Sequence, residues 1–210
     1  MTHYFSEKQD SKLILKKINI KTKKISFDLY TSNGVFSKEH LDKGTELLLN
    51  EAILKDNCSV LDLGCGIGVV GIYVKLLYTN TNVLMSDINE RAVYLARKNI
   101  ELHKLEKNNL VNKDIKRKKN IEARKSDIFS NIKENFDIIL LNPPQTAGKE
   151  ICFKMIEESF LHLNKNGLFQ LVARHKKGGL TLSKKMLEVF GNLKVIAQKS
   201  GFKIYLSEKI

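Results

Sequence analysis

Short apolar runs alternate with longer amphipathic stretches along most of the chain. Nearly continuous apolar runs, which are typical of buried strands, occupy 59–62, 82–86, 136–141 and 168–173. Apolar residues recur at helical spacing over 69–77, 90–102, 150–163 and 180–190. A weaker strand is predicted at 121–125, and two further strands at 193–198 and 202–207 close the chain.

This alternation predicts an α/β fold. Strands that are apolar on both faces are typical of a parallel sheet covered by helices on both sides. The last two strands are joined only by Lys199-Ser200-Gly201, which is too short for a crossover helix, so they must be antiparallel. We therefore expect a Rossmann-like, doubly wound, seven-stranded sheet that is mainly parallel, with one antiparallel strand near an edge.

The N-terminal region shows a different pattern. Runs at 12–20 and 24–30, linked by the polar segment Lys21-Thr22-Lys23, predict a β-hairpin, and a helix is expected over 47–54, with Asp42 or Thr45 as its cap. We expect residues 1–40 to form a hairpin extension packed on a domain spanning 41–210. Residues 106–120 lose all periodicity and are basic, which indicates a surface insertion, either a solvated loop or an arm that contacts RNA.

Composition narrows the setting of this fold. The 210 residues carry a net charge of +13 and include 3 cysteines, which are widely spaced. The excess of positive charge favours a polyanionic partner such as nucleic acid, although biased amino-acid usage is the alternative. No membrane-spanning run, secretory signal, CxxC pair or cluster of metal-ligating residues is visible, so we expect a cytoplasmic protein without a metal.

A glycine-rich turn follows the strand at 59–62 and precedes the helix at 69–77. Glycines at this position allow a sharp turn and a close backbone approach to a ligand. A phosphate-binding P-loop has a lysine after its last glycine, and none follows here. The glycines also lack the spacing G-x-G-x-x-G of a dinucleotide-binding fingerprint. Cys65 is interpreted as a small spacer within the turn. The predicted contact residues of this turn are Asp62, Gly64, Cys65, Gly66 and Gly68.

Acidic residues follow the next two strands. Asp87 lies where a nucleotide site places the acid that accepts hydrogen bonds from a ribose, and Ile88 is placed to pack on an adenine. Asp127, followed by Ile128, is a candidate acceptor for the adenine amino group. For both acids the alternative is a helix or turn cap.

The segment Asn142-Pro143-Pro144 directly follows the strongest predicted strand. Ligands of open α/β sheets bind beyond the carboxyl ends of the strands. Prolines fix the backbone and lack N–H donors, so a turn of this kind presents acceptors. Together with the side-chain oxygen of Asn142, these acceptors suit a planar amino group, and alignment of that group promotes its attack on a methyl group. The alternative is an ordinary proline turn.

These motifs, in this order, resemble class I S-adenosylmethionine-dependent methyltransferases that modify exocyclic amines. Gly34-Val35-Phe36-Ser37 and Leu41-Asp42-Lys43-Gly44-Thr45 narrow the resemblance to small-subunit ribosomal RNA guanine-N2 methyltransferases, the methyltransferase small domain group. Asn142-Pro143-Pro144 followed by Ala147-Gly148-Lys149-Glu150 is similar to its short, single-domain archaeal members.

The resemblance implies methyl transfer from S-adenosylmethionine to guanine N2 in RNA. It also implies that Gly44 and Thr45 help to close the cofactor site and that Phe36 lies near the target base. Gln145 occupies a position that is aromatic in many amino-methyltransferases, so stacking on the base either comes from elsewhere, with Phe36 as the candidate, or is weaker. RNA contacts are expected at Arg174, Lys176 and Lys177, as well as at the lysines of 16–24 and 113–119.

Two other interpretations remain open. The same enzyme class also acts on protein glutamine amides, DNA adenine and small molecules, and Asn-Pro-Pro serves those acceptors too. A non-catalytic RNA-binding protein on a methyltransferase fold is the second alternative. The oligomeric state cannot be read from the sequence.

Overall fold

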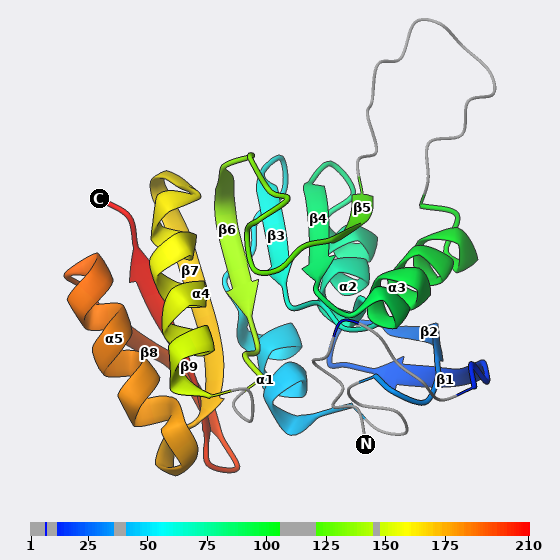
Figure 1. Cartoon of the computed structure of the whole chain (residues 1–210), viewed down its shortest axis with the longest axis horizontal. Coiled ribbons are helices and arrows are strands. Elements are labelled where there is room, and N and C mark those ends of the chain that lie inside the picture. The colour runs from blue at the N-terminus through cyan, green and yellow to red at the C-terminus, as the bar shows by residue number, and fades with distance from the viewer. Residues whose placement is uncertain (1–6, 8–11, 36–40, 106–120, 145–147) are drawn as a thin grey trace, which may run out of the picture.

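The computed structural model describes residues 7, 12–35, 41–105, 121–144 and 148–210. Its central sheet has seven strands in the order β5-β4-β3-β6-β7-β9-β8 (Figure 1). β3 (Ser59–Leu63), β4 (Asn82–Asp87), β5 (Ile121–Lys125), β6 (Phe136–Leu141) and β7 (Leu163–Arg174) run parallel to one another. β9 (Phe202–Glu208) is antiparallel to both β7 and the edge strand β8 (Lys194–Lys199). The fold class predicted from the sequence is confirmed.

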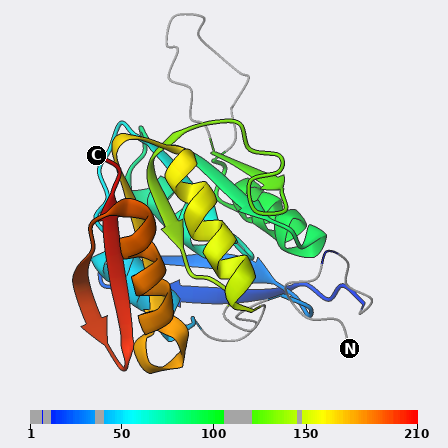
Figure 2. The same cartoon turned by 60° about the vertical axis from the view of Figure 1, so that its left-hand side comes forward.

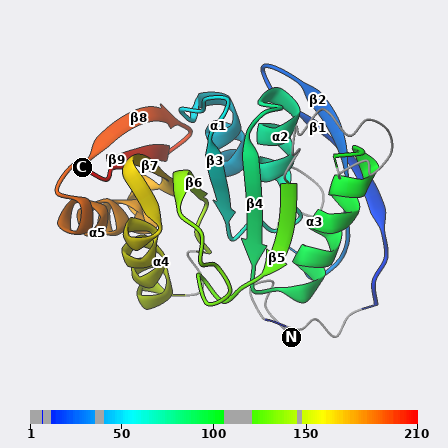
Figure 3. The ribbon, with the colours of Figure 1, turned by 90° about the horizontal axis from the view of Figure 1, so that it is seen from above.

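Helices cover both faces of this sheet. α1 (Lys43–Glu51), α2 (Val69–Leu77) and α3 (Glu90–Leu102) pack on one face, and α4 (Lys149–Leu161) and α5 (Leu180–Phe190) on the other, as seen from above in Figure 3. Neighbouring residues of a strand point to opposite faces. In β3, Val60 accordingly joins the core under α2, and Leu61 joins the core under α4.

The N-terminal strands β1 (Lys16–Lys21) and β2 (Ser26–Thr31) form a separate antiparallel hairpin. Phe27 and Leu29 of β2 are buried in the same core as α2 and α3, so the hairpin is packed on the domain (Figure 2). The side chain of Asn99, on α3, is fully buried and bonds the backbone of Tyr30 and the carbonyl of Ile67. One amide therefore connects the hairpin to the glycine-rich turn.

Some predicted boundaries are wrong because long-range hydrogen bonds overrule local periodicity. The helix expected over 47–54 begins at Lys43 and ends at Glu51. The backbone of Ile53 instead donates to and accepts from the side chain of Gln170 on β7, at 2.8 and 2.7 Å. The helix expected over 150–163 ends at Leu161, because the carbonyl of His162 accepts from Phe136 N and β7 already begins at Leu163.

The turn η2 (His175–Gly179), in which Lys177 and Gly178 depart from helical dihedral angles, connects β7 to α5. Together with the turn after β3 and the segment after β6, it lies at the edge of the sheet where the parallel strands end (Figure 1). No helix among the described residues is long and apolar enough to cross a membrane. All three cysteines are buried and free.

Candidate functional site

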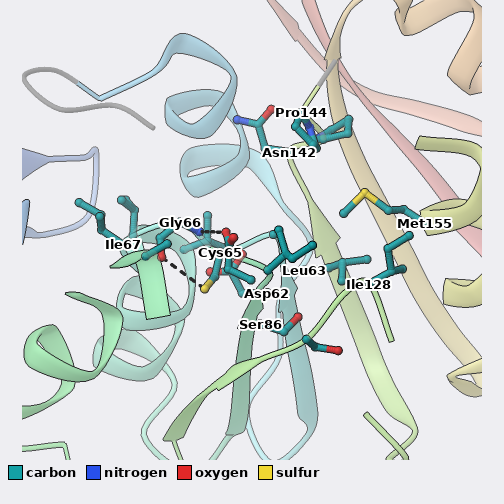
Figure 4. A pocket seen from close by; sticks show the side chains of 18 of the residues that line it. Asp62, Leu63, Cys65, Gly66, Ile67, Ser86, Ile128, Asn142, Pro144 and Met155 are labelled. Atoms are coloured by element: carbon teal, nitrogen blue, oxygen red, sulfur yellow. Dashed lines mark hydrogen bonds between the residues drawn. The ribbon is translucent and has the colours of Figure 1, made fainter. Parts of the chain in front are cut away.

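A cavity of about 390 Å³ opens beyond the carboxyl ends of β3, β4 and β6. The strand order reverses between β3 and β6, and ligands of open α/β sheets bind at such a switch point. Figure 4 shows Asn142 and Pro144 on one side of the cavity and Asp62, Cys65 and Ser86 on the other. The predicted residues that line it are Thr45, Asp62, Gly64, Cys65, Gly66, Asp87, Ile88, Asp127, Ile128, Asn142, Pro143 and Pro144.

The glycines of the turn have different tasks. Gly66 has a φ of +54°, and a Cβ placed on it would meet no atom within 4 Å, because it would project into open space. Gly68 also has a positive φ, but it does not line the cavity; a Cβ there would lie 2.9 Å from Met85 Sδ. The lack of a side chain at Gly68 thus allows α2 to pack against β4, and its contact with the cofactor stays a prediction.

Asp62 joins the end of β3 to the start of α2. Its Oδ2 accepts a hydrogen bond from Gly71 N at 2.9 Å, which satisfies an N-terminal donor of α2 that Gly68, the helix cap, cannot reach with a side chain. Burial raises the pKa of Asp62 to about 7, and the nearby charge of Asp87 adds to this shift. A carboxylate therefore already occupies the helix terminus that would otherwise favour a phosphate.

Asp87 is fixed from two sides. Its carboxylate accepts from Gly66 N and from Asn89 N, both at 2.9 Å, while burial raises its pKa. The cap of α3 is Asn89, whose side chain accepts from Arg91 N and Ala92 N. Asp87 is consequently not the helix cap, and its carboxylate oxygens retain lone pairs for a ligand in the cavity.

The loop after β5 adds an exposed acid and a strained residue. Asp127 is exposed at the cavity, and its backbone N–H donates to Ser130 Oγ at 3.1 Å. Ile128 has a φ of +51°, which is rare for a β-branched residue and is found chiefly where a site imposes it. Burial against the core holds Ile128 in this conformation; only 8% of the residue is exposed.

The side-chain amide of Asn142 is held in one orientation. Its Nδ2 donates to Asp42 Oδ2 and to Thr45 Oγ1, each at 3.0 Å. Asp42 also accepts from Thr45 N at 2.9 Å and caps α1. Because both hydrogens of the amide are engaged there, the Oδ1 of Asn142 remains as the acceptor at the cavity.

Other predicted site residues lie elsewhere. Gly44 is buried outside the cavity lining; a Cβ on it would approach Asp42 Oδ2 to 3.0 Å and the Phe202 ring to 3.1 Å. The lack of a side chain at Gly44 lets α1 approach β9, and its contact with the cofactor stays a prediction. Arg174, Lys176 and Lys177 line a separate groove. Phe36, Gln145 and the basic segment 106–120 lie outside the described residues.

Sequence reasoning did not identify Ser86 or the first turns of α4 as site residues. The Oγ of Ser86 is buried at the cavity and is one of 3 buried side-chain polar atoms without a partner in the described chain. Ile151, Lys154 and Met155 line the cavity from α4. Their spacing places them on one face of the helix that follows Asn142. This spacing is the feature of the sequence that indicates them as site residues.

The lining fits a cationic, nucleoside-containing cofactor. Asp62, Asp87 and Asp127 contribute carboxyl groups, whereas Lys154 is the one basic residue in the lining that the structure describes. This set disfavours a pyrophosphate and suits a sulfonium and ribose hydroxyls. The unpartnered Ser86 hydroxyl and the open space at Gly66 indicate room prepared for a ligand.

The comparisons with known proteins agree with this chemistry. Residues 26–206 match the profile of the methyltransferase small domain family. The chain belongs to the methyltransferase small domain family. Its resemblance to the small-subunit ribosomal RNA methyltransferases is thereby confirmed. It is a methyltransferase whose cofactor is S-adenosylmethionine.

Several relatives of this methyltransferase are similar over most of its length. The chain is 34% identical over 181 residues to ribosomal RNA small subunit methyltransferase C of Haemophilus influenzae, covering 84% of this chain and 50% of the relative. It is 31% identical over 211 residues to the uncharacterized protein YbxB of Bacillus subtilis, covering 99% and 98% of the two chains. The chain thus spans about half the length of the named ribosomal RNA methyltransferase and nearly all of YbxB.

Among solved structures, the fold is similar to that of the T. thermophilus 16S rRNA N2 methyltransferase RsmC, which was solved with AdoMet and guanosine. The TM-score is 0.76 at 20% identity, and the match covers 95% of this chain and 52% of RsmC. At this identity the likeness concerns the fold.

Proposed function

We propose that this methyltransferase transfers the methyl group of S-adenosylmethionine to guanine N2 in small-subunit ribosomal RNA. The observation that carries the proposal is the fixed orientation of Asn142 at the cavity. The similarity to ribosomal RNA small subunit methyltransferase C and the net charge of +13 support RNA as the carrier of the target amine.

The amine would be bound at the Asn142-Pro143-Pro144 turn. The Oδ1 of Asn142 accepts one hydrogen of the amine, and a carbonyl of the turn accepts the other. Both acceptors together direct the nitrogen lone pair toward the methyl donor and raise its electron density. Asp42 and Thr45 hold the Asn142 amide and so prevent the rotamer that would present Nδ2 to the amine.

The opposite side of the cavity would hold the cofactor. Bound S-adenosylmethionine would supply an electrophilic methyl group: as the amine nitrogen forms the new N–C bond, the S–C bond breaks and the sulfur leaves as a neutral thioether, after which the methylated nitrogen releases one proton to solvent. Asp87 accepts from the ribose hydroxyls, Asp127 from the adenine amino group, and Ile88 and Ile128 pack against the adenine. The glycine-rich turn, above all Gly66, lies under the methionine portion, and Thr45 closes the site from α1.

Transfer of labelled methyl groups to RNA, DNA and protein pools, followed by nucleoside analysis, tests this proposal. The expected product is N2-methylguanosine in small-subunit ribosomal RNA. Transfer to protein or DNA alone, or to a different nucleoside, would overturn the assigned acceptor while leaving the methyltransferase assignment intact.

Asn142→Ala tests the role of Asn142 in the proposed reaction. The variant is expected to bind S-adenosylmethionine as the wild-type protein does, measured by calorimetry, and to lose methyl transfer. Full activity of this variant would remove Asn142 from the proposed mechanism. A variant that no longer binds the cofactor would show that Asn142 mainly supports the opposite side of the cavity.

A further inference from the structure

A second hollow, of about 510 Å³, lies outside the cofactor cavity. It is formed by the end of β7, the η2 turn and the tip of the β8–β9 hairpin. We define the basic groove by its four cationic residues, Arg174, Lys176, Lys177 and Lys203. Its other lining residues are His175, Gln198 and Gly201, so no carboxylate of the described chain faces it.

The cations of the basic groove are not neutralised within the described chain. None of the four forms an ion pair or a side-chain hydrogen bond with a described residue; Arg174 only stacks on the Phe202 ring, at 5.9 Å from its centroid. Other surface lysines do have partners: Lys199 pairs with Glu46 at 2.8 Å, and Lys17 of the hairpin pairs with Asp28 at 2.9 Å. The groove is thus a local concentration of unpaired positive charge.

The backbone that carries these cations is held rigidly. His175 N donates to Gly201 O at 2.9 Å, and His175 Nδ1 lies 2.7 Å from the Tyr205 hydroxyl. Gly179 packs so closely that a Cβ on it would lie 2.9 Å from Arg174 O. A backbone that is already held in place leaves less conformational freedom to be lost when a ligand binds than a loose loop does.

The end of β7, which contributes Arg174 to the basic groove, lies at the same edge of the sheet as the end of β6, which precedes Asn142 (Figure 1). Phe202, under the Arg174 guanidinium, packs against Gly44, and the adjacent Thr45 holds the Asn142 amide. A short series of packed residues therefore connects the groove to the proposed amine site. Three acids and one lysine of the described chain line the cofactor cavity, which disfavours phosphates inside it, so we expect the backbone of a polyanionic chain that delivers a base to be bound outside the cavity.

We propose that the basic groove binds backbone phosphates of the RNA strand that carries the target base. This inference rests on the proposed function, because it takes RNA as the substrate. It assigns substrate affinity to a groove shared by η2 and the β8–β9 hairpin, and it adds Lys203 to the RNA contacts. Catalysis is assigned to the Asn142 turn. Substitutions that remove positive charges from the groove are therefore expected to raise KM for RNA and to leave kcat unchanged.

A matched pair of double variants tests the groove. Lys176→Gln with Lys203→Gln removes two charges from it, and Lys165→Gln with Lys194→Gln removes two charges from exposed or edge positions at the opposite end of β7 and β8. We expect the groove variant to bind unmethylated small-subunit ribosomal RNA roughly tenfold more weakly. Its slope of log affinity against log salt should be smaller by about 1.4, as for two single-strand phosphate contacts. The control variant should bind RNA nearly as the wild-type protein does.

Two outcomes would overturn the inference. Equal losses in the two double variants would show that net charge, and not the groove, sets the affinity. An unchanged RNA affinity of the groove variant would show that the strand lies elsewhere. Calorimetry with S-adenosylmethionine verifies that both variants keep an intact cofactor site. If RNA binding depends on the groove but no N2-methylguanosine forms, the groove stands and the proposed reaction fails.

Discussion

Asp42 does not line the cavity, yet it should control methyl transfer because it orients Asn142. Its Oδ2 accepts from Asn142 Nδ2 at 3.0 Å and, as the cap of α1, from Thr45 N at 2.9 Å. Asp42→Ala removes both bonds. Loss of the helix cap costs about 1 kcal/mol of unfolding free energy. Loss of a hydrogen bond to a charged acceptor weakens the hold on the amide by about 1.5 kcal/mol or more.

The expected effect on catalysis follows from the loss of the hydrogen bond to the amide. About 1.4 kcal/mol corresponds to a factor of ten in a conformational equilibrium, so the freed amide would sample orientations that turn Nδ2 toward the amine. We expect kcat for RNA methylation to fall roughly ten- to hundredfold, with the affinity for S-adenosylmethionine unchanged. Asp42→Asn keeps an acceptor oxygen and an equally good cap, so its kcat should stay within about fivefold of the wild type.

Asn50→Ala is the control that destabilises α1 without changing the orientation of the Asn142 amide. Asn50 lies near the other end of α1, where its side chain bonds Glu46 O at 2.8 Å and Lys23 N at 2.9 Å. This variant should lose about 1 kcal/mol of unfolding free energy in urea and keep its kcat. A wild-type kcat in Asp42→Ala, or an equal fall in Asn50→Ala, would refute the reasoning.

Three further predictions concern the other side of the cavity. Gly66→Ala should fold at a cost of about 1 kcal/mol for its positive φ, but its affinity for the cofactor, measured by calorimetry, should fall. Gly71→Ala is the comparison: its Cβ would clash with the side chain of Met85, so its melting temperature should fall instead. The pKa of Asp62 is raised to about 7 in the folded protein, so its contribution to stability is present below pH 4 and is lost as pH rises to about 7. In Asp62→Asn, the free energy of unfolding measured in urea should lack this decline between about pH 4 and pH 7. A decline equal to that of the wild type would contradict the role assigned to Asp62. Ser86→Ala removes a buried hydroxyl without a partner, so the free protein should become about 1 kcal/mol more stable and bind the cofactor more weakly; an unchanged affinity would exclude a ligand contact.

Local pattern and motif chemistry already determined much of this protein. Continuous apolar strands, amphipathic helices and the short link before β9 were enough to predict the seven-stranded sheet and its antiparallel strand. Acids and Asn142 at strand ends were enough to predict one site, because the ends of parallel strands meet at one edge of the sheet. Each element and each strand end is recognised from a short local stretch, and the rule that parallel strands end at one edge brings the distant stretches together.

The tertiary structure decided how these residues are used. Asp42 and Asn142 are 100 positions apart, and no local pattern indicates that one fixes the amide of the other. The close packing at Gly44 and Gly68 depends on the side chains of Phe202 and Met85, which are distant in the sequence. Which lysines remain unpaired also depends on distant carboxylates. The orientation of the Asn142 amide, the close packing at the glycines and the pairing of the lysines all arise from contacts between distant parts of the chain. Sequence periodicity reports only local structure and therefore does not predict them.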